Sequence, residues 1–228
     1  MFIRKMLSSA MVAGSALLMC AAMTPAQAVP MTLQTANNQT GNQAYSGVGV
    51  EFSVNSAITV SALGIWDSNQ DGITASPTDP LSAFLLTGAG AVVSSATFDS
   101  TSQGTLDVGS GGYRFKSIPL TTLLPGDYVL AGYGWTDNDL EHNCSYGGGC
   151  DTFNTGGGLL TYLGSPFGFG GDAPGTLPTF HCCGDFNFFS AANLQFTAVP
   201  LPTSIALLGA GLLVLASNRR KALNRVSS

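Results

Sequence analysis

Asp67, Asn69 and Asp71 place side-chain oxygens at alternate positions of one short segment, and a glycine follows them. Carboxylate and amide oxygens at this spacing, with glycine at the sixth position, form the first half of a calcium-binding loop. The closing Glu of such a loop is missing, because Thr78 stands at the twelfth position. Asp-Gly is also a favoured pair in tight turns. The segment therefore predicts either a calcium site or a polar turn between two strands.

A second group of residues with potential chemistry combines cysteines with histidines. Its members are His142, Cys144, Cys150, His181, Cys182 and Cys183. Thiolates and imidazoles are ligands that zinc prefers, but this spacing matches no common zinc pattern. Disulfides explain the same residues, and we expect them to pair Cys144 and Cys150 with Cys182 and Cys183. Three connectivities of four cysteines stay open.

Hydrolytic chemistry has little support in the sequence. Neither a Gly-x-Ser-x-Gly elbow nor a His-Glu-x-x-His motif occurs. A catalytic triad would have to use His142 or His181, and both lie beside cysteines. Asp137, Asp139 and Glu141 supply paired carboxylates, which glycosidases need, but without a pocket signature they indicate a solvated acidic turn. We therefore predict a protein that is not an enzyme, with a secreted hydrolase as a remaining alternative.

The residues with potential chemistry are expected to lie on or between short strands. Apolar and polar residues alternate in Val48–Val54, and Pro125-Gly126 is a typical turn. Further strands are expected at 58–65, 81–86, 92–98, 113–118, 127–134 and 193–197, with a bulge at Leu63-Gly64, where the alternation changes phase. The expected fold is all-β: a single antiparallel β-sandwich, Ig-like or jelly-roll-like, plus an N-terminal signal helix and a C-terminal single transmembrane helix.

Residues 137–187 form the least regular part of the expected domain. They are dense in glycine, and they offer only a weak strand candidate at 159–163. Loops of this length are usually functional or held by cross-links. A disulfide that closes such a loop contributes about 3–4 kcal/mol in the chain-entropy treatment. We therefore predict a long Cys- and Gly-rich loop at 137–187.

The distribution of charge separates the termini from the body of the chain. All 13 acidic residues lie in residues 29–198, with only Arg114 and Lys116 to balance them, a formal charge of −11. The other basic residues lie in the two terminal segments. Such a body is repelled by nucleic acid and by anionic lipid. We therefore expect no nucleic-acid partner.

The first 28 residues read as a secretory signal peptide. Arg4 and Lys5 precede an apolar run, and Ala26-Gln27-Ala28 forms a small-x-small cleavage site. An uncleaved anchor helix is the alternative. Export places the domain, residues 29–198, in an oxidising compartment where disulfides persist.

The C-terminal segment 199–221 has three parts in a fixed order. Val199, Pro200, Leu201 and Pro202 come first, then the uncharged run 203–217, and then the basic stop Arg219, Arg220 and Lys221. An apolar run before a basic cluster is typical of a transmembrane segment, here 203–217, whose basic end stays inside, which makes 222–228 the cytoplasmic end. As a helix the run spans about 22 Å, short of the ~30 Å hydrocarbon core. An ordinary C-terminal anchor is the alternative to a transient sorting signal.

This order of parts resembles the PEP-CTERM sorting signal of Gram-negative bacteria, which the membrane protease-transpeptidase exosortase recognises. Leu201 stands where that signal usually has Glu. The run VGVEFSVNSAITVSALGIWDSNQDG and the later GGYRFKSIPLTTLLPGDYVLAGYG also resemble a β-sandwich module that recurs in proteins with such tails. The resemblance implies an exported protein, anchored at least transiently in the inner membrane, with its body periplasmic or at the cell surface, and an exosortase-type enzyme as partner.

The function expected from the sequence is that of a non-enzymatic surface protein of the envelope or exopolysaccharide matrix. The alternative is a carbohydrate-binding module, with or without calcium, that uses exposed aromatic residues. Most aromatic residues of the second half are expected in the core instead: Tyr128, Tyr133, Trp135, Phe167, Phe169, Phe186, Phe188 and Phe189.

Overall fold

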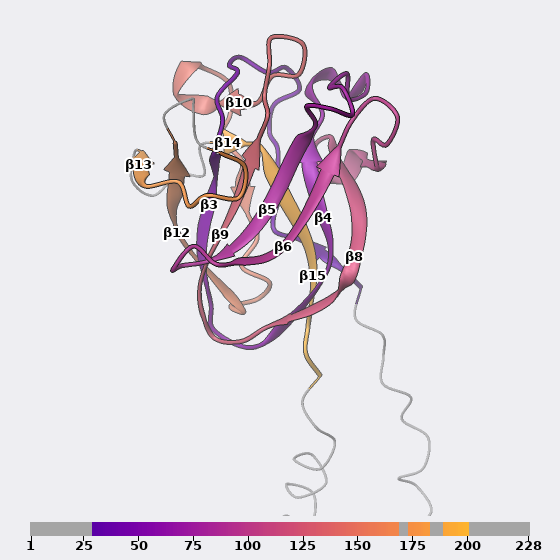
Figure 1. Cartoon of the computed structure of the whole chain (residues 1–228). Helices are drawn as coiled ribbons and strands as arrows, with labels where there is room; N and C mark the ends of the chain where they lie inside the picture. The colour runs from indigo at the N-terminus through magenta and orange to yellow at the C-terminus, as the bar shows by residue number, and fades with distance from the viewer. Residues whose placement is uncertain (1–28, 169–172, 183–188, 201–228) are drawn as a thin grey trace, which may run out of the picture.

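The computed structural model describes residues 29–168, 173–182 and 189–200 (Figure 1). The signal segment 1–28 and the tail from Leu201 onward, including Pro202 and the basic stop 219–221, lie outside the described residues. Within the described ranges the chain is all-β, and its sheets are antiparallel, which confirms the expected class. No helix in that part of the chain is long and apolar enough to cross a membrane.

Two main sheets contain most of the described strands. The first has the order β1 (Met31–Thr32), β15 (Ala192–Ala198), β4 (Ile58–Trp66), β8 (Tyr113–Leu123) and β7 (Thr105–Asp107). The second has the order β13 (Phe180–Cys182), β12 (Leu160–Phe167), β3 (Val48–Val54), β9 (Gly126–Tyr133), β5 (Leu81–Thr87) and β6 (Val92–Phe98). Two short pairs complete the fold: β10 (His142–Asn143) with β14 (Phe189–Ser190), and β11 (Thr152–Phe153) with β2 (Gln34–Thr35).

One hydrophobic core joins the two main sheets. Val50 and Phe52 of β3 are fully buried, and so are Leu194 and Phe196 of β15 in the other sheet. These residues alternate with more exposed ones along each strand, as a sheet with one buried face requires. Strand β9 is buried on its outer face as well, where Leu177 packs against it.

Most of the strands predicted from alternation are confirmed. Strand β3 has the predicted bounds, and β5, β6, β8, β9 and β15 agree to within a few residues at most ends. The predicted bulge exists, but it lies at Ser61, where the pairing of β4 with β15 skips one residue of β4 between Val60 and Ala62, and not at Leu63-Gly64. The single irregular loop predicted at 137–187 is wrong, because β10, β11, β12 and β13 lie inside that stretch.

The two ends of the described domain differ in what they carry. Strands β1 and β15 are antiparallel neighbours, with Met31 opposite Phe196, so the chain enters and leaves at the same end (Figure 1). We call this end the tail pole; it also holds the turn 55–57, whose Ala57 carbonyl accepts a hydrogen bond from Val199 N at 3.2 Å. The opposite end, the loop pole, holds the loops 67–80, 99–112 and 134–151.

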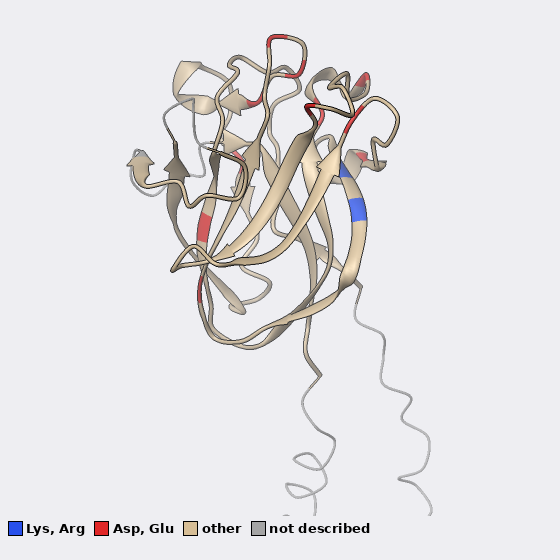
Figure 2. Cartoon of the chain, viewed as in Figure 1, with Lys and Arg blue, Asp and Glu red and all other residues tan. Residues whose placement is uncertain are grey.

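The acidic residues of the described chain gather at the loop pole (Figure 2). Glu51 and Asp127 are the exceptions among the described residues, since both lie on strands of the second sheet. The domain therefore has a negative field at the end that lies away from both chain termini.

Candidate functional site

A pocket of about 210 Å³ opens at the loop pole. Within the part of the chain that the structure describes, no residue that lines it carries a charge, and its wall combines aromatic rings with amides and hydroxyls. The lining residues are Gln43, Tyr45, Asn143, Ser145, Tyr146, Phe167 and Phe189. Tyr146 is 75% exposed at the rim, whereas Phe189 is buried at the base.

Four separate segments supply this wall, and strand pairing brings them together. Gln43 forms an isolated bridge with Glu141, two residues before Asn143. Asn143 of β10 lies opposite Phe189 of β14. Phe167, at the end of β12, lies opposite the first residue of β3. Because β12 and β3 are inner strands of the second sheet, Phe167 is held by a hydrogen-bonded ladder on both sides of its strand.

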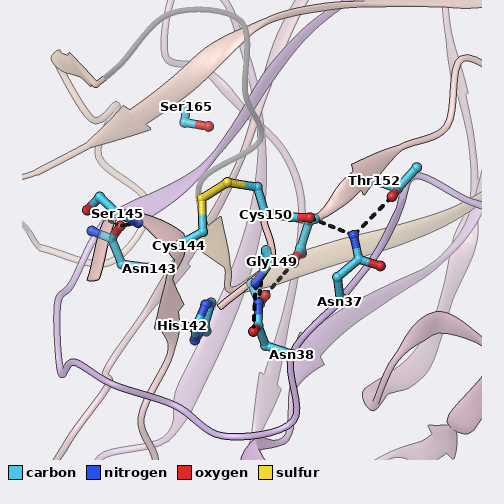
Figure 3. The surroundings of a disulfide bond; sticks show 12 residues. Asn37, Asn38, His142, Asn143, Cys144, Ser145, Gly149, Cys150, Thr152 and Ser165 are labelled. Carbon is cyan, nitrogen blue, oxygen red and sulfur yellow. Dashed lines mark hydrogen bonds between the residues drawn. A yellow bond between two sulfur atoms is a disulfide. The ribbon is translucent and has the colours of Figure 1, made fainter. Parts of the chain in front are cut away.

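A disulfide between Cys144 and Cys150 closes the loop beside the pocket (Figure 3). This bond spans six positions of sequence and excludes a bond from either cysteine to Cys182 or Cys183, so of the three connectivities left open only the one that pairs Cys144 with Cys150 remains. The spacing in sequence could not select it, because a disulfide depends on the distance and direction of the two side chains in the fold. Cys182 belongs to β13 through its backbone, and its side chain and Cys183 lie outside the described residues.

Asparagine side chains fasten the disulfide loop to the segment that precedes β3. Asn37 Nδ2 donates to Cys150 O at 2.6 Å and to Thr152 Oγ1 at 3.1 Å, and Asn38 Oδ1 accepts from Gly149 N at 3.0 Å (Figure 3). Sequence reasoning missed this role. The run Asn-Asn-Gln-Thr-Gly-Asn-Gln at 37–43 was the available signal, because such side chains bond readily to nearby backbone.

Asn143 organises the polar side of the pocket. Its backbone is held by Asn42, whose Oδ1 accepts from Asn143 N at 2.9 Å and whose Nδ2 donates to Asn143 O at 2.9 Å. The Asn143 Oδ1 atom accepts from Ser145 N at 2.9 Å and from Ser145 Oγ at 2.6 Å. Its Nδ2 donates to Gln43 Oε1 at 3.3 Å. The side chains of Gln43, Asn143 and Ser145 are thus held in place before any ligand arrives.

Two buried acids lie behind this wall. Glu141 is fully buried, and neither of its carboxyl oxygens has a hydrogen-bond partner. Burial raises the pKa of Glu141 to about 9. The nearby Gln43 amide opposes this rise in part, although it lies too irregularly to form a hydrogen bond with the carboxyl group. Burial also raises the pKa of Asp151 to about 7, against hydrogen bonds from Ser190 Oγ at 2.5 Å and Tyr113 Oη at 2.8 Å. At neutral pH Glu141 is therefore protonated in the folded chain.

His142 is not placed where a hydrolase would need its histidine, at the wall of a pocket. It is buried, its Nδ1 lies 3.1 Å from Thr40 O, and its ring contacts the edge of Trp66. Burial lowers the pKa of His142, so the imidazole is neutral at pH 7. The second histidine, His181, lies 3.4 Å from Glu51 and is exposed. Neither histidine lines the pocket.

The Asp67 segment forms a polar turn in which the carboxylate already has a partner. Arg114 Nε donates to Asp67 Oδ2 at 2.6 Å, and Gly72 N lies 3.2 Å from both carboxylate oxygens. Asn69 Oδ1 accepts from Thr40 Oγ1 at 3.0 Å, and Asp71 is exposed. Across the part of the chain that the structure describes, no group of three or more His, Cys, Asp or Glu residues could hold a metal ion. These contacts favour the turn over the calcium site.

A comparison of the chain with protein-family models finds no match, and a search of curated proteins finds none either. The function therefore has to be inferred from the residues and their arrangement.

Proposed function

We propose that this chain is a non-enzymatic, exported surface protein that its PEP-CTERM-like tail holds at the membrane, at least transiently, and that it belongs to the envelope or exopolysaccharide matrix. The pairing of β1 with β15 carries this proposal, because it brings the described residues next to each targeting segment to the same end, the tail pole. A domain held there presents the loop pole, with its pocket, to the surroundings. The two sheets around one core fit a β-sandwich of the Ig-like or jelly-roll-like kind.

The end of β15 supports a sorting role for the tail. Val199 makes the last described backbone bond of the strand, and Pro200 cannot extend the ladder because it lacks an amide hydrogen. The chain is therefore free to leave the sheet at Pro200, where an exosortase-type enzyme would need access. The Cys144–Cys150 disulfide agrees with an oxidising compartment outside the cytoplasm.

The non-enzymatic part of the proposal follows from the position of the histidines. A hydrolase of this sequence needs His142 or His181 at a pocket, and His142 is enclosed by its own contacts while His181 faces solvent on the second sheet. Calcium does not enter the proposal, because Asp67 is already neutralised by Arg114.

The mature C-terminus tests this proposal directly. The full chain is expressed in a Gram-negative host that carries an exosortase, and the protein from the cell-surface and membrane fractions is analysed by mass spectrometry. We expect surface protein that starts near Val29 and ends near Pro200. The triple change Arg219→Gln, Arg220→Gln and Lys221→Gln should leave the tail unprocessed, whereas Arg225→Gln, outside the cluster, should not.

Surface protein that still ends at Ser228, or cytosolic protein that still carries residues 1–28, would overturn the proposal. The same fractions from a host without exosortase separate a sorting signal from an ordinary anchor, because only the signal depends on the enzyme.

A further inference from the structure

We propose that the pocket at the loop pole is a binding site for one ring of an uncharged saccharide, presented as part of a neutral polysaccharide. This site is additional to the sorting role, and its evidence is independent of the tail. It would give the exported domain a ligand in the material that surrounds the cell.

The lining has the mixed character that a sugar ring requires. A pyranose has apolar C–H faces that pack on aromatic rings and hydroxyls that need donors and acceptors at its edge. Tyr146, Tyr45 and Phe167 supply rings that are exposed or half-buried at the wall. Among the described residues the hydroxyls of Tyr45 and Tyr146 make no hydrogen bond, so both are available to a ligand.

The charges around the pocket disfavour acidic sugars as ligands. Among the described residues none that lines the pocket is charged, so an acidic sugar would find no cation there to pair with. It would also have to approach the acidic loop pole (Figure 2), whose field repels it. The same field would attract a cationic ligand, but among the described residues no acid lines the pocket to pair with it. An uncharged ligand needs no charged partner in the pocket.

The size of the pocket limits how much of the ligand it can hold. Its volume of about 210 Å³ lies below the roughly 300–1,000 Å³ of pockets for drug-sized ligands. One ring fits such a space, while neighbouring rings of a polymer would run past the exposed rim at Tyr146.

The pocket is also preorganised, which reduces the entropic cost of binding. The loop that carries Tyr146 is closed by the Cys144–Cys150 disulfide and fastened by Asn37 and Asn38. Few side chains need to be ordered when the ligand binds, so a small contact area can give measurable affinity.

Binding of purified polysaccharides tests the proposal. The surface-released protein is run by affinity electrophoresis in gels that contain a neutral glucan, a neutral galactomannan or a polyuronate, and neutral monosaccharides are titrated by NMR. We expect retardation in at least one neutral gel and none in the polyuronate gel. Because Tyr146 is exposed, Tyr146→Ala should leave the fold intact and weaken binding about tenfold, as for a central aromatic contact.

Two further variants separate the pocket from the rest of the surface. Tyr45→Phe removes one hydroxyl and should weaken binding by several-fold, and Leu120→Ala, which changes an exposed apolar residue near the tail pole, should not weaken it. Any of four results would overturn the proposal: no neutral saccharide bound at millimolar concentration, polyuronate bound more tightly than neutral polymers, binding unaffected by Tyr146→Ala, or displacement of the saccharide by apolar peptides. None of these results bears on the mature C-terminus, so the sorting proposal stands or falls separately.

Discussion

Replacement of Glu141 by Gln should remove a large part of the pH dependence of the domain's stability. Glu141 is fully buried with both carboxyl oxygens unpartnered, and burial raises its pKa from the ordinary 4.5 to about 9. In the unfolded chain the same group ionises near its ordinary pKa, so folding takes up a proton at neutral pH. The contribution of this protonated Glu141 to the free energy of unfolding is fully present below pH 4.5 and is lost progressively as the pH rises toward 9.

The magnitude follows from the two pKa values. Over this window each pH unit costs about 1.4 kcal/mol of unfolding free energy, so the rise from pH 5 to pH 7 costs about 3 kcal/mol through Glu141 alone. Glutamine keeps the shape of the protonated acid and cannot ionise. The Glu141→Gln protein should therefore lose about 3 kcal/mol less than the wild type between these two pH values.

Urea unfolding of the exported protein at pH 5, 6, 7 and 8 measures this difference. Asp151 adds a parallel slope between its ordinary 3.8 and about 7, but it does so in both proteins and cancels in the comparison. Asp137→Asn, at an exposed acid of the same loop, is the matched control and should follow the wild type. Equal slopes for the wild type and Glu141→Gln would refute the reasoning, because they would mean that Glu141 is not held protonated in the folded chain.

Four further outcomes are expected. Arg114→Met leaves the Asp67 carboxylate buried and unpaired, so chemical denaturation should show a loss of about 3 kcal/mol at pH 7, and an unchanged midpoint would contradict the ion pair. Gly49→Ala would drive a Cβ into the Leu130 carbonyl oxygen of β9, so the variant should lose about 3 kcal/mol or fail to fold by circular dichroism; native-like stability would show that the backbone of β9 does not pack against Gly49. The double change Cys144→Ser and Cys150→Ser should cost about 2 kcal/mol in the chain-entropy treatment, and peptide mapping of the wild type should recover these two cysteines linked to each other, not to other cysteines. Calcium at millimolar concentration should not raise the melting temperature relative to chelator, and a clear rise would restore the metal site at Asp67.

The strands were predictable because each main strand has one face in a shared core. In Val48–Val54 the four apolar side chains are all buried, and Glu51 and Ser53 between them are more exposed. Strand β12 was predicted only in part, as the weak candidate at 159–163, because a register shift between Tyr162 and Gly164 breaks its alternation and Pro166 argues against a strand. The two-residue strands, such as β10 and β14, are too short to leave a periodic signal, and only their partners define them.

The candidate site was far less predictable than the fold. Its lining residues come from positions between 43 and 189, and no local pattern links Gln43 to Phe189. Phe167 and Phe189 were expected in the core, and both are indeed largely covered, yet the structure also places them in the pocket wall. The ion pair of Asp67 could not be predicted for the same reason, because its partner Arg114 lies 47 residues away in sequence.

The neighbours of β15 have a mechanical consequence for a protein held by its tail. The strand is an inner one, bonded to β4 along its length and to β1 on its other side. Tension between a tethered tail and a polymer seated at the far end would act along the axis of β15. Such a load shears the flanking ladders all at once instead of unzipping them bond by bond. The domain should therefore withstand drag forces that would peel away an edge strand of similar length.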